Sequence, residues 1–99
     1  MIHVLAIITA KPGLLPKVLE AFKANVPNVL IEDGCIEYGA AVDVANARTA
    51  FGPDTFVVIE KWRDQDALRA HAVAPHMKAY AATSADWVAS RAIHILDPA

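Results

Sequence analysis

Hydrophobic residues follow strand-like and helix-like patterns that divide the chain into alternating elements. Runs that are apolar at every second position, or apolar on both faces, indicate strands. Four such runs are present, over residues 2–9, 35–44, 55–63 and 87–96. The last of these is most regular from Ala92 to Leu96.

Helical spacing of apolar residues predicts a first helix from Gly13 to about Asn25. Pro16 fits only in its first turn, where a missing N–H costs nothing, and Pro27 is interpreted as its end. A short extended piece is expected at 29–31, followed by a turn at Asp33-Gly34.

Two further helical segments are predicted between the third and fourth strands. Asp64 is a favourable N-cap for a helix that runs to about His71. Pro75 suits the first position of a second segment that ends near Thr83. The element order is then β-α-β-β-α-β, which is typical of an α+β, ferredoxin-like domain with a four-stranded antiparallel sheet over residues 1–99.

The pattern of the first and third strands predicts a homodimer. Helices from this chain can cover one face of the sheet, and an open face of an antiparallel sheet normally carries polar residues. Yet Leu5 and Ile7, and Val57 and Ile59, place apolar side chains on the second face as well. The simplest cover is the same face of a second copy in a C2 dimer.

Composition excludes several classes of protein. Hydrophobic residues make up 56% of the chain, the net charge is -2, and no cluster of Lys and Arg suggests a nucleic-acid partner. A single cysteine, Cys35, excludes an intrachain disulfide framework. The first apolar run is too short to span a membrane and has no basic segment before it, so a cytoplasmic location is expected.

The third strand and the following helix carry the candidate chemistry. Glu60 and Trp62 share one face of the strand with two apolar residues, and the helix from Asp64 delivers His71 close to the strand's end. A titratable group beside an aromatic ring in apolar surroundings is a common form of small-molecule site. We therefore expect Glu60, Trp62 and His71 to meet at one site.

The same segments resemble the antibiotic biosynthesis monooxygenase domain. The resemblance rests on a Gly-Cys turn leading into a strand with a tyrosine, a strand ending in Glu-x-Trp, and a helix with a histidine before Pro-His. In this chain the motifs are Asp33-Gly34-Cys35-Ile36-Glu37-Tyr38, Phe56 to Trp62, and Leu68, His71, Pro75 and His76. The resemblance implies a dimeric α+β barrel with a pocket between sheet and helices. It also implies oxidation of quinols, anthrones or similar phenolic compounds by O2, without flavin, haem or metal.

In such a reaction the deprotonated substrate itself reduces O2, and the protein supplies a base and a dry pocket. His71 is the first candidate for that base, since its unperturbed pKa of about 6.5 leaves a neutral form available. Its structural alternative is a hydrogen bond to the sheet. Trp62 is a candidate wall for an aromatic substrate or, alternatively, a packing residue of the core.

Three more residues are candidates for substrate contact. Glu60 must be paired or protonated if it faces inward; it can hold His71 in one tautomer or pair with a cation such as Arg91 across the sheet. Tyr38 stands at the family's tyrosine position, where its hydroxyl can bond a substrate oxygen or a backbone carbonyl. His76 is expected near the pocket mouth or the surface. His3 and His94, assigned to outer strands, are expected to be structural.

Metal and cofactor sites lack sequence support. His71 and His76 do not have the i, i+4 spacing of a helical zinc site, and Cys35 has no CxxC partner. No glycine-rich loop suggests a nucleotide, NAD or flavin. Haem-degrading relatives of this fold use a histidine on the second helix and an asparagine on the first strand. Here Ala81-Ala82-Thr83 follows Tyr80, and the first strand has no asparagine, which disfavours haem.

The leading functional hypothesis is a cofactor-independent monooxygenase that takes a small aromatic substrate and O2. Two alternatives stay open on the same fold: a non-catalytic small-molecule binder or stress-response dimer, and an isomerase or lyase that moves a proton through His71. A closed pocket of a few hundred Å3 around His71 would favour an active site over a filled core. Pocket size is expected to depend on the loop at residues 46–53 and on how far the helices stand off the sheet.

Overall fold

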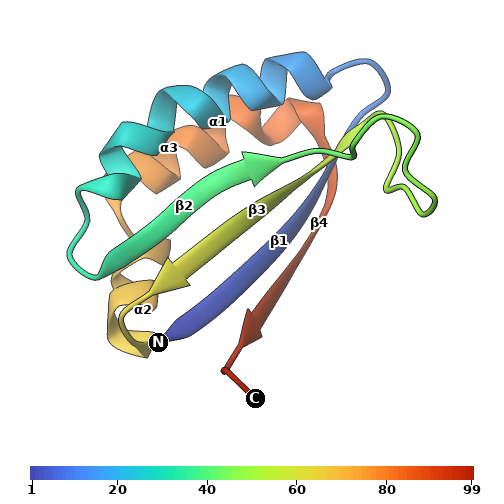
Figure 1. The fold of residues 1–99 in the computed structure, drawn as a ribbon. Coiled ribbons are helices and arrows are strands. Elements are labelled where there is room, and N and C mark those ends of the chain that lie inside the picture. Colours follow the sequence, from blue (N-terminus) through green and yellow to red (C-terminus); the bar gives the residue numbers. More distant parts are fainter.

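A four-stranded antiparallel sheet with all helices on one side builds the fold (Figure 1). The computed structural model describes residues 1–99. The strands are β1 (Ile2–Ala10), β2 (Cys35–Ala41), β3 (Thr55–Trp62) and β4 (Val88–Leu96), in the spatial order β2-β3-β1-β4. The helices are α1 (Leu15–Leu30), α2 (Gln65–Ala72) and α3 (Pro75–Ser84), and a short 3-10 turn at Ala85–Trp87 leads into β4. The predicted ferredoxin-like fold is confirmed.

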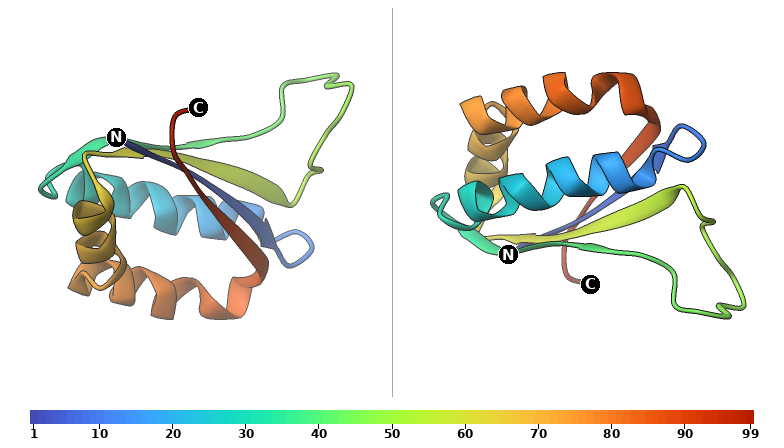
Figure 2. Two further views of the ribbon diagram at one scale, coloured as in Figure 1. Left: turned by 90° about the horizontal axis from the view of Figure 1, so that it is seen from below. Right: turned by 90° about the horizontal axis from the view of Figure 1, so that it is seen from above.

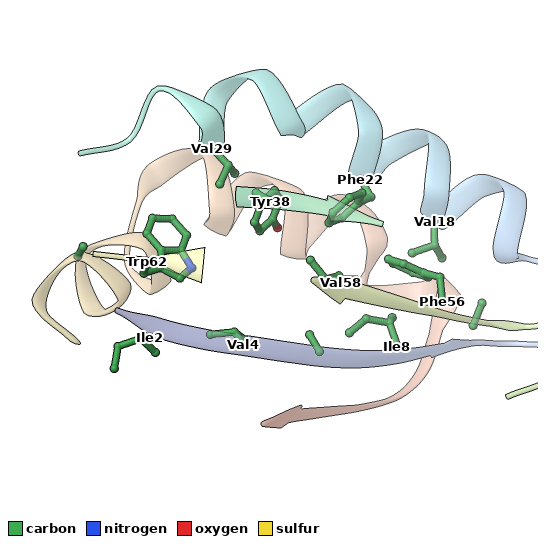
Figure 3. Close-up of a cluster of buried hydrophobic side chains, with 13 residues drawn as sticks. Ile2, Val4, Ile8, Val18, Phe22, Val29, Tyr38, Phe56, Val58 and Trp62 are labelled. Atoms are coloured by element: carbon green, nitrogen blue, oxygen red, sulfur yellow. The ribbon is translucent and has the colours of Figure 1, made fainter. Parts of the chain in front are cut away.

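The core lies between the helix-facing side of the sheet and α1 (Figure 3). Alternate residues of β1 are buried from Ile2 to Ala10, as the strand period of two requires. Phe22 of α1 stacks on Tyr38 at 5.2 Å between ring centroids and meets the edge of Phe56 at 5.5 Å. These aromatic contacts fix α1 over β2 and β3, and the helix-facing side of β4 stays largely exposed.

Helix α1 continues through Pro27, so the predicted end at that residue and the extended piece at 29–31 are wrong. A proline inside a helix removes one backbone hydrogen bond and costs about 3 kcal/mol. Val29 lies on the last turn and is fully buried, and burying a valine contributes about 1.5–3 kcal/mol. Tertiary packing of Val29 therefore offsets much of the local penalty.

Strand β2 ends at Ala41 and not at residue 44 as predicted. Val42 and Val44 are exposed in the loop 42–54, which extends away from the sheet and helices (Figure 2). The carboxylate of Asp43 accepts hydrogen bonds from the backbone N–H groups of Phe51 and Gly52 at 3.1 and 3.0 Å. These bonds close the loop locally and take Val42 and Val44 out of the strand pairing.

The predicted helix starts near the candidate site are confirmed. The side chain of Asp64 caps α2 by accepting a hydrogen bond from the N–H of Ala67 at 2.8 Å, and Pro75 opens α3. Between them the chain turns at Val73 and Ala74. The short, capped α2 places His71 on its last turn, facing the sheet.

The second face of the sheet carries no helix. Leu5, Ile7, Val57 and Ile59 lie there, partly exposed, on the two inner strands β1 and β3. His3 also lies on this face, on β1, so its predicted position on an outer strand is wrong, while His94 is on the edge strand β4 as expected. None of the helices is long and apolar enough to cross a membrane.

Candidate functional site

A cavity of about 380 Å3 lies between the helix-facing side of the sheet and helices α2 and α3. Its walls are mainly apolar, and its charged or titratable side chains are few. These are Glu60, His71, Lys78 and Arg91, together with the phenols of Tyr38 and Tyr80. A largely apolar cavity with a few polar groups is the usual form of a small-molecule site.

His71 projects from α2 into this cavity and is held from both sides of its ring. Its Nδ1 lies 2.9 Å from Oε2 of Glu32, and its Nε2 lies 3.9 Å from Oε1 of Glu60. An ionised carboxylate only accepts hydrogen bonds, so the contact with Glu32 favours the neutral tautomer with its proton on Nδ1. The lone pair of Nε2 then remains on the side of Glu60, which is the side of the cavity.

Glu32 is the site residue that the sequence analysis missed. It lies two residues after the end of α1, and its Oε2 also lies 2.8 Å from Nε2 of His76, so one carboxylate oxygen contacts two histidines. The side chains of His71, Glu32 and His76 are 7%, 13% and 25% exposed. His76 therefore sits outward of the cavity, as expected, and belongs to the site through Glu32. The only signal in the sequence that could have identified Glu32 is its position as an acidic residue between an apolar pair and the turn at Asp33-Gly34.

Glu60 is buried on β3 and faces the cavity. Burial raises the pKa of its carboxyl above the usual range, although the hydrogen bond from Trp62 and the nearby His71 act in the opposite direction. The Nε1–H of Trp62 donates to Oε1 of Glu60 at 2.9 Å. Glu60 forms no ion pair with Arg91, so that predicted alternative is wrong: Arg91 pairs in register with Ile8, far along the sheet from Glu60.

Trp62 and Tyr38 flank His71 on different sides. The ring of Trp62 lies 4.5 Å from the ring of His71, but Trp62 is fully buried and does not line the cavity. It thus supports His71 and Glu60 from behind. Tyr38 does line the cavity, 5.5 Å from His71 between ring centroids. Burial and the neighbouring Glu60 raise the pKa of its phenol, which keeps the hydroxyl protonated and able to donate to a ligand.

The loop 42–54 contributes nothing to this cavity, so the predicted dependence of its size on residues 46–53 is wrong. The size is set by α2 and α3 above β1, β3 and β4. Cys35 lies half-buried at the start of β2. Burial and the charges of Glu32 and Glu60 raise the pKa of its thiol, and a protonated thiol is a poor nucleophile.

Comparison with known sequences identifies relatives of the whole chain. A family model described as antibiotic biosynthesis monooxygenase matches residues 1–83. The protein "Probable quinol monooxygenase YgiN" of Escherichia coli K12 is 39% identical over 102 residues, which cover 99% of this chain and 98% of the relative. The match therefore includes every residue of the site described above.

Comparison with solved structures gives the same fold. The crystal structure of PA3566 from Pseudomonas aeruginosa aligns with a TM-score of 0.84 and 26% identity, over 99% of this chain and 93% of the other. Rv0793 from Mycobacterium tuberculosis aligns with a TM-score of 0.83 at 22% identity, over 99% and 94% of the two chains. The second likeness supports the architecture alone.

Proposed function

Since the chain belongs to the antibiotic biosynthesis monooxygenase family, we propose that it oxidises a small quinol, anthrone or similar phenolic compound with O2 and without a cofactor. The observation that carries the proposal is the position of His71. Its Nδ1 contacts a carboxylate, and its Nε2 is directed to the side of a largely apolar cavity. An imidazole held in this way is suited to act as a general base.

The proposed reaction begins when Nε2 of His71 removes the proton of the substrate hydroxyl or acidic C–H. The imidazolium that forms is stabilised by Glu32, in the manner of a carboxylate that orients and supports a catalytic histidine. The electron-rich anion then reduces O2. One oxygen atom enters the product and the other leaves as water, together with two hydrogens of the substrate. The apolar walls keep water from the anion.

Four other residues have supporting roles in the proposal. Tyr38 donates a hydrogen bond from its phenol to a substrate oxygen, and Glu60, whose carboxyl pKa is raised by burial, is a polar contact on the same side of the cavity. Trp62 positions His71 and Glu60 through its ring contact and its Nε1–H. His76 holds Glu32 from the outer side.

The proposal includes a homodimer formed through the open face of the sheet. Leu5 and Ile7 on β1 face the same side as Val57 and Ile59 on β3, and the helices of the chain cover only the other side. A contiguous apolar patch on an antiparallel sheet favours burial against a partner. The same face of a second copy is self-complementary by C2 symmetry.

The test is O2 uptake by metal-free protein with a panel of quinols and anthrones, beside His71→Ala. We expect uptake above the spontaneous rate with the native chain and loss of that excess in the variant. Gln65→Ala serves as a control, because Gln65 is an exposed residue of the same helix. Full activity in His71→Ala would refute the assignment of the base. Proton exchange into a bound carbonyl compound without O2 uptake would instead support an isomerase.

A further inference from the structure

Two cations line the cavity away from the proposed base. Arg91 comes from β4 and Lys78 from α3, and both are exposed at the cavity's margin. Neither forms an ion pair within the chain, in contrast to Lys61, Arg63 and Arg69. The two cations that face the cavity are therefore free to bind a negative charge supplied by a ligand.

The strand register places Arg91 at the opposite end of the cavity from Glu60. Glu60 pairs with Val4, which pairs with Ile95, whereas Arg91 lies four residues before Ile95 on β4. Four residues of a strand span about 13 Å, and two strand spacings add about 10 Å across the sheet. The two Cα atoms are thus separated by roughly 16 Å on the same face.

Lys78 lines the same cavity as Arg91, from the helix that precedes β4. Helix α3 and strand β4 are consecutive and run in opposite directions on either side of the 3-10 turn (Figure 1). Each cation is about 10 Å from that turn, given the rise per residue of a helix or a strand. Arg91 and Tyr80 of α3 line the same cavity, and the positive charge of Arg91 lowers the pKa of Tyr80 against the larger raising effect of burial.

The floor between the two ends is apolar and only partly covered. Ala6 of β1 and Ile93 and Ile95 of β4 lie on the helix-facing side and line the cavity. Ile93 and Ile95 are 59% and 53% exposed, although they face the helices. A flat apolar body lying on them would bury this surface between the two polar ends.

We infer that the substrate is a phenolic compound of two or three fused rings that carries a carboxylate at the end remote from its reactive hydroxyl. The hydroxyl would lie at His71, the rings on Ala6, Ile93 and Ile95, and the carboxylate at Arg91 and Lys78. Arg binds a carboxylate through two parallel N–H bonds, and Lys adds a second charge. Only one part of the inference rests on the proposed function, namely the position of the hydroxyl.

The test compares equilibrium binding of a naphthoquinone carboxylate with that of its methyl ester, which has the same rings and no charge. Both are oxidised compounds, so binding is measured by calorimetry without turnover. We expect the carboxylate to bind about tenfold more tightly at low salt, a difference of about 1.4 kcal/mol, because it can form charge-assisted hydrogen bonds with the two cations. The preference should fall at high salt because ions screen exposed charges.

Variants test which residues cause the preference for the acid over the ester. In Arg91→Gln the acid and the ester should bind within about twofold of each other, and Arg91→Lys should recover part of the difference. Lys78→Gln should lower the preference less. Arg69→Gln is the control, since Arg69 is exposed on α2 and pairs with Asp66. Equal binding of acid and ester by the native chain, or an undiminished preference in Arg91→Gln, would overturn the inference.

The outcome is separable from that of the proposed function. A preference for the acid that depends on Arg91, without any O2 uptake, would support the anion site and refute the monooxygenase. O2 uptake with neutral quinols, with no preference for the acid, would support the monooxygenase and refute the anion site.

Discussion

Glu32 contacts His71 at 2.9 Å across 39 positions of sequence, and the contact falls on the ring nitrogen that points away from Glu60. The arrangement separates two functions of one imidazole. Nδ1 anchors the ring to the end of α1, while Nε2 is left to the cavity. A second histidine, His76, contacts the same oxygen of Glu32 from the outer side.

Glu32→Gln should slow turnover far more than it weakens substrate binding. The amide keeps the size of the side chain but removes the charge that stabilises protonated His71. A hydrogen bond to a charged group contributes about 1.5–3 kcal/mol, which corresponds to roughly 10- to 100-fold in kcat. Steady-state kinetics with the best substrate of the panel should show this loss with KM nearly unchanged.

The matched control for this variant is Asp33→Asn, because Asp33 is the adjacent acid and pairs at the surface with Arg63. Nitrogen NMR of His71 gives an independent readout, since Glu32→Gln should reduce the population with the proton on Nδ1. An unchanged tautomer together with an unchanged kcat would show that Glu32 has only a structural role.

Glu60→Gln should change how stability depends on pH. Because burial raises the pKa of Glu60, the folded protein retains a proton that the unfolded chain has released. The native chain therefore loses stability as pH rises from the unfolded pKa, about 4.3, to the raised folded pKa, by about 1.4 kcal/mol for each unit between them. The Gln variant lacks this loss, so its stability relative to that of the native chain should rise over that pH range.

Urea unfolding of both proteins at a series of pH values measures the effect. All other carboxyl groups are shared, so their contributions cancel in the difference between native chain and variant. The free energies of unfolding of the native chain and the variant should be most alike at the lowest pH values of the series. A difference that does not vary with pH would mean that the pKa of Glu60 is not raised.

Gly34→Ala should destabilise the fold more than Gly13→Ala. Both glycines have positive φ, at 85° and 78°, which costs a substituted residue about 1–2 kcal/mol. At Gly34 an added Cβ would also lie 2.5 Å from Cβ of Ala67 on α2, whereas at Gly13 it meets nothing within 4 Å. Overpacking adds about 1–3 kcal/mol.

Thermal or urea unfolding of the two variants isolates the clash, because the conformational penalty is common to both. Gly34→Ala should also reduce activity, since Ala67 belongs to the helix that carries His71. Equal losses of stability in the two variants would argue that α2 can move away from the turn at no cost.

Ile7→Asp and Ile59→Asp should dissociate the proposed homodimer. Each variant places a charge at the centre of the open sheet face, where burial of an unpaired carboxylate is strongly unfavourable. Both side chains are partly exposed within one chain, so the fold itself should tolerate the change. Sedimentation of the variants should show monomers where the native chain shows dimers.

Val44→Asp is the control for this experiment, because Val44 is an exposed apolar residue of the loop 42–54. It should leave the dimer intact. Dimers that persist in both sheet variants would place the interface elsewhere or refute the homodimer.

The parts of the site that lie within one local pattern could be predicted from the sequence. The period of two along β3 placed Glu60 and Trp62 on the buried face, and Asp64 marked the start of the helix that carries His71. Glu32 could not be found in this way, because its partners come from α2 and α3 and no periodicity links them. The course of α1 through Pro27 depends likewise on the burial of Val29, which is a tertiary effect.

The hydrogen bond between Glu32 and His71 also joins the two halves of the chain. Glu32 follows the first strand and helix, whereas His71 comes from the second helical unit, and the loop 42–54 lies between them. Neither half alone contains both groups. During synthesis, therefore, the proposed base His71 is not oriented by Glu32 until α2 has docked. The proposed proton transfer would then be confined to chains in which both halves have come together.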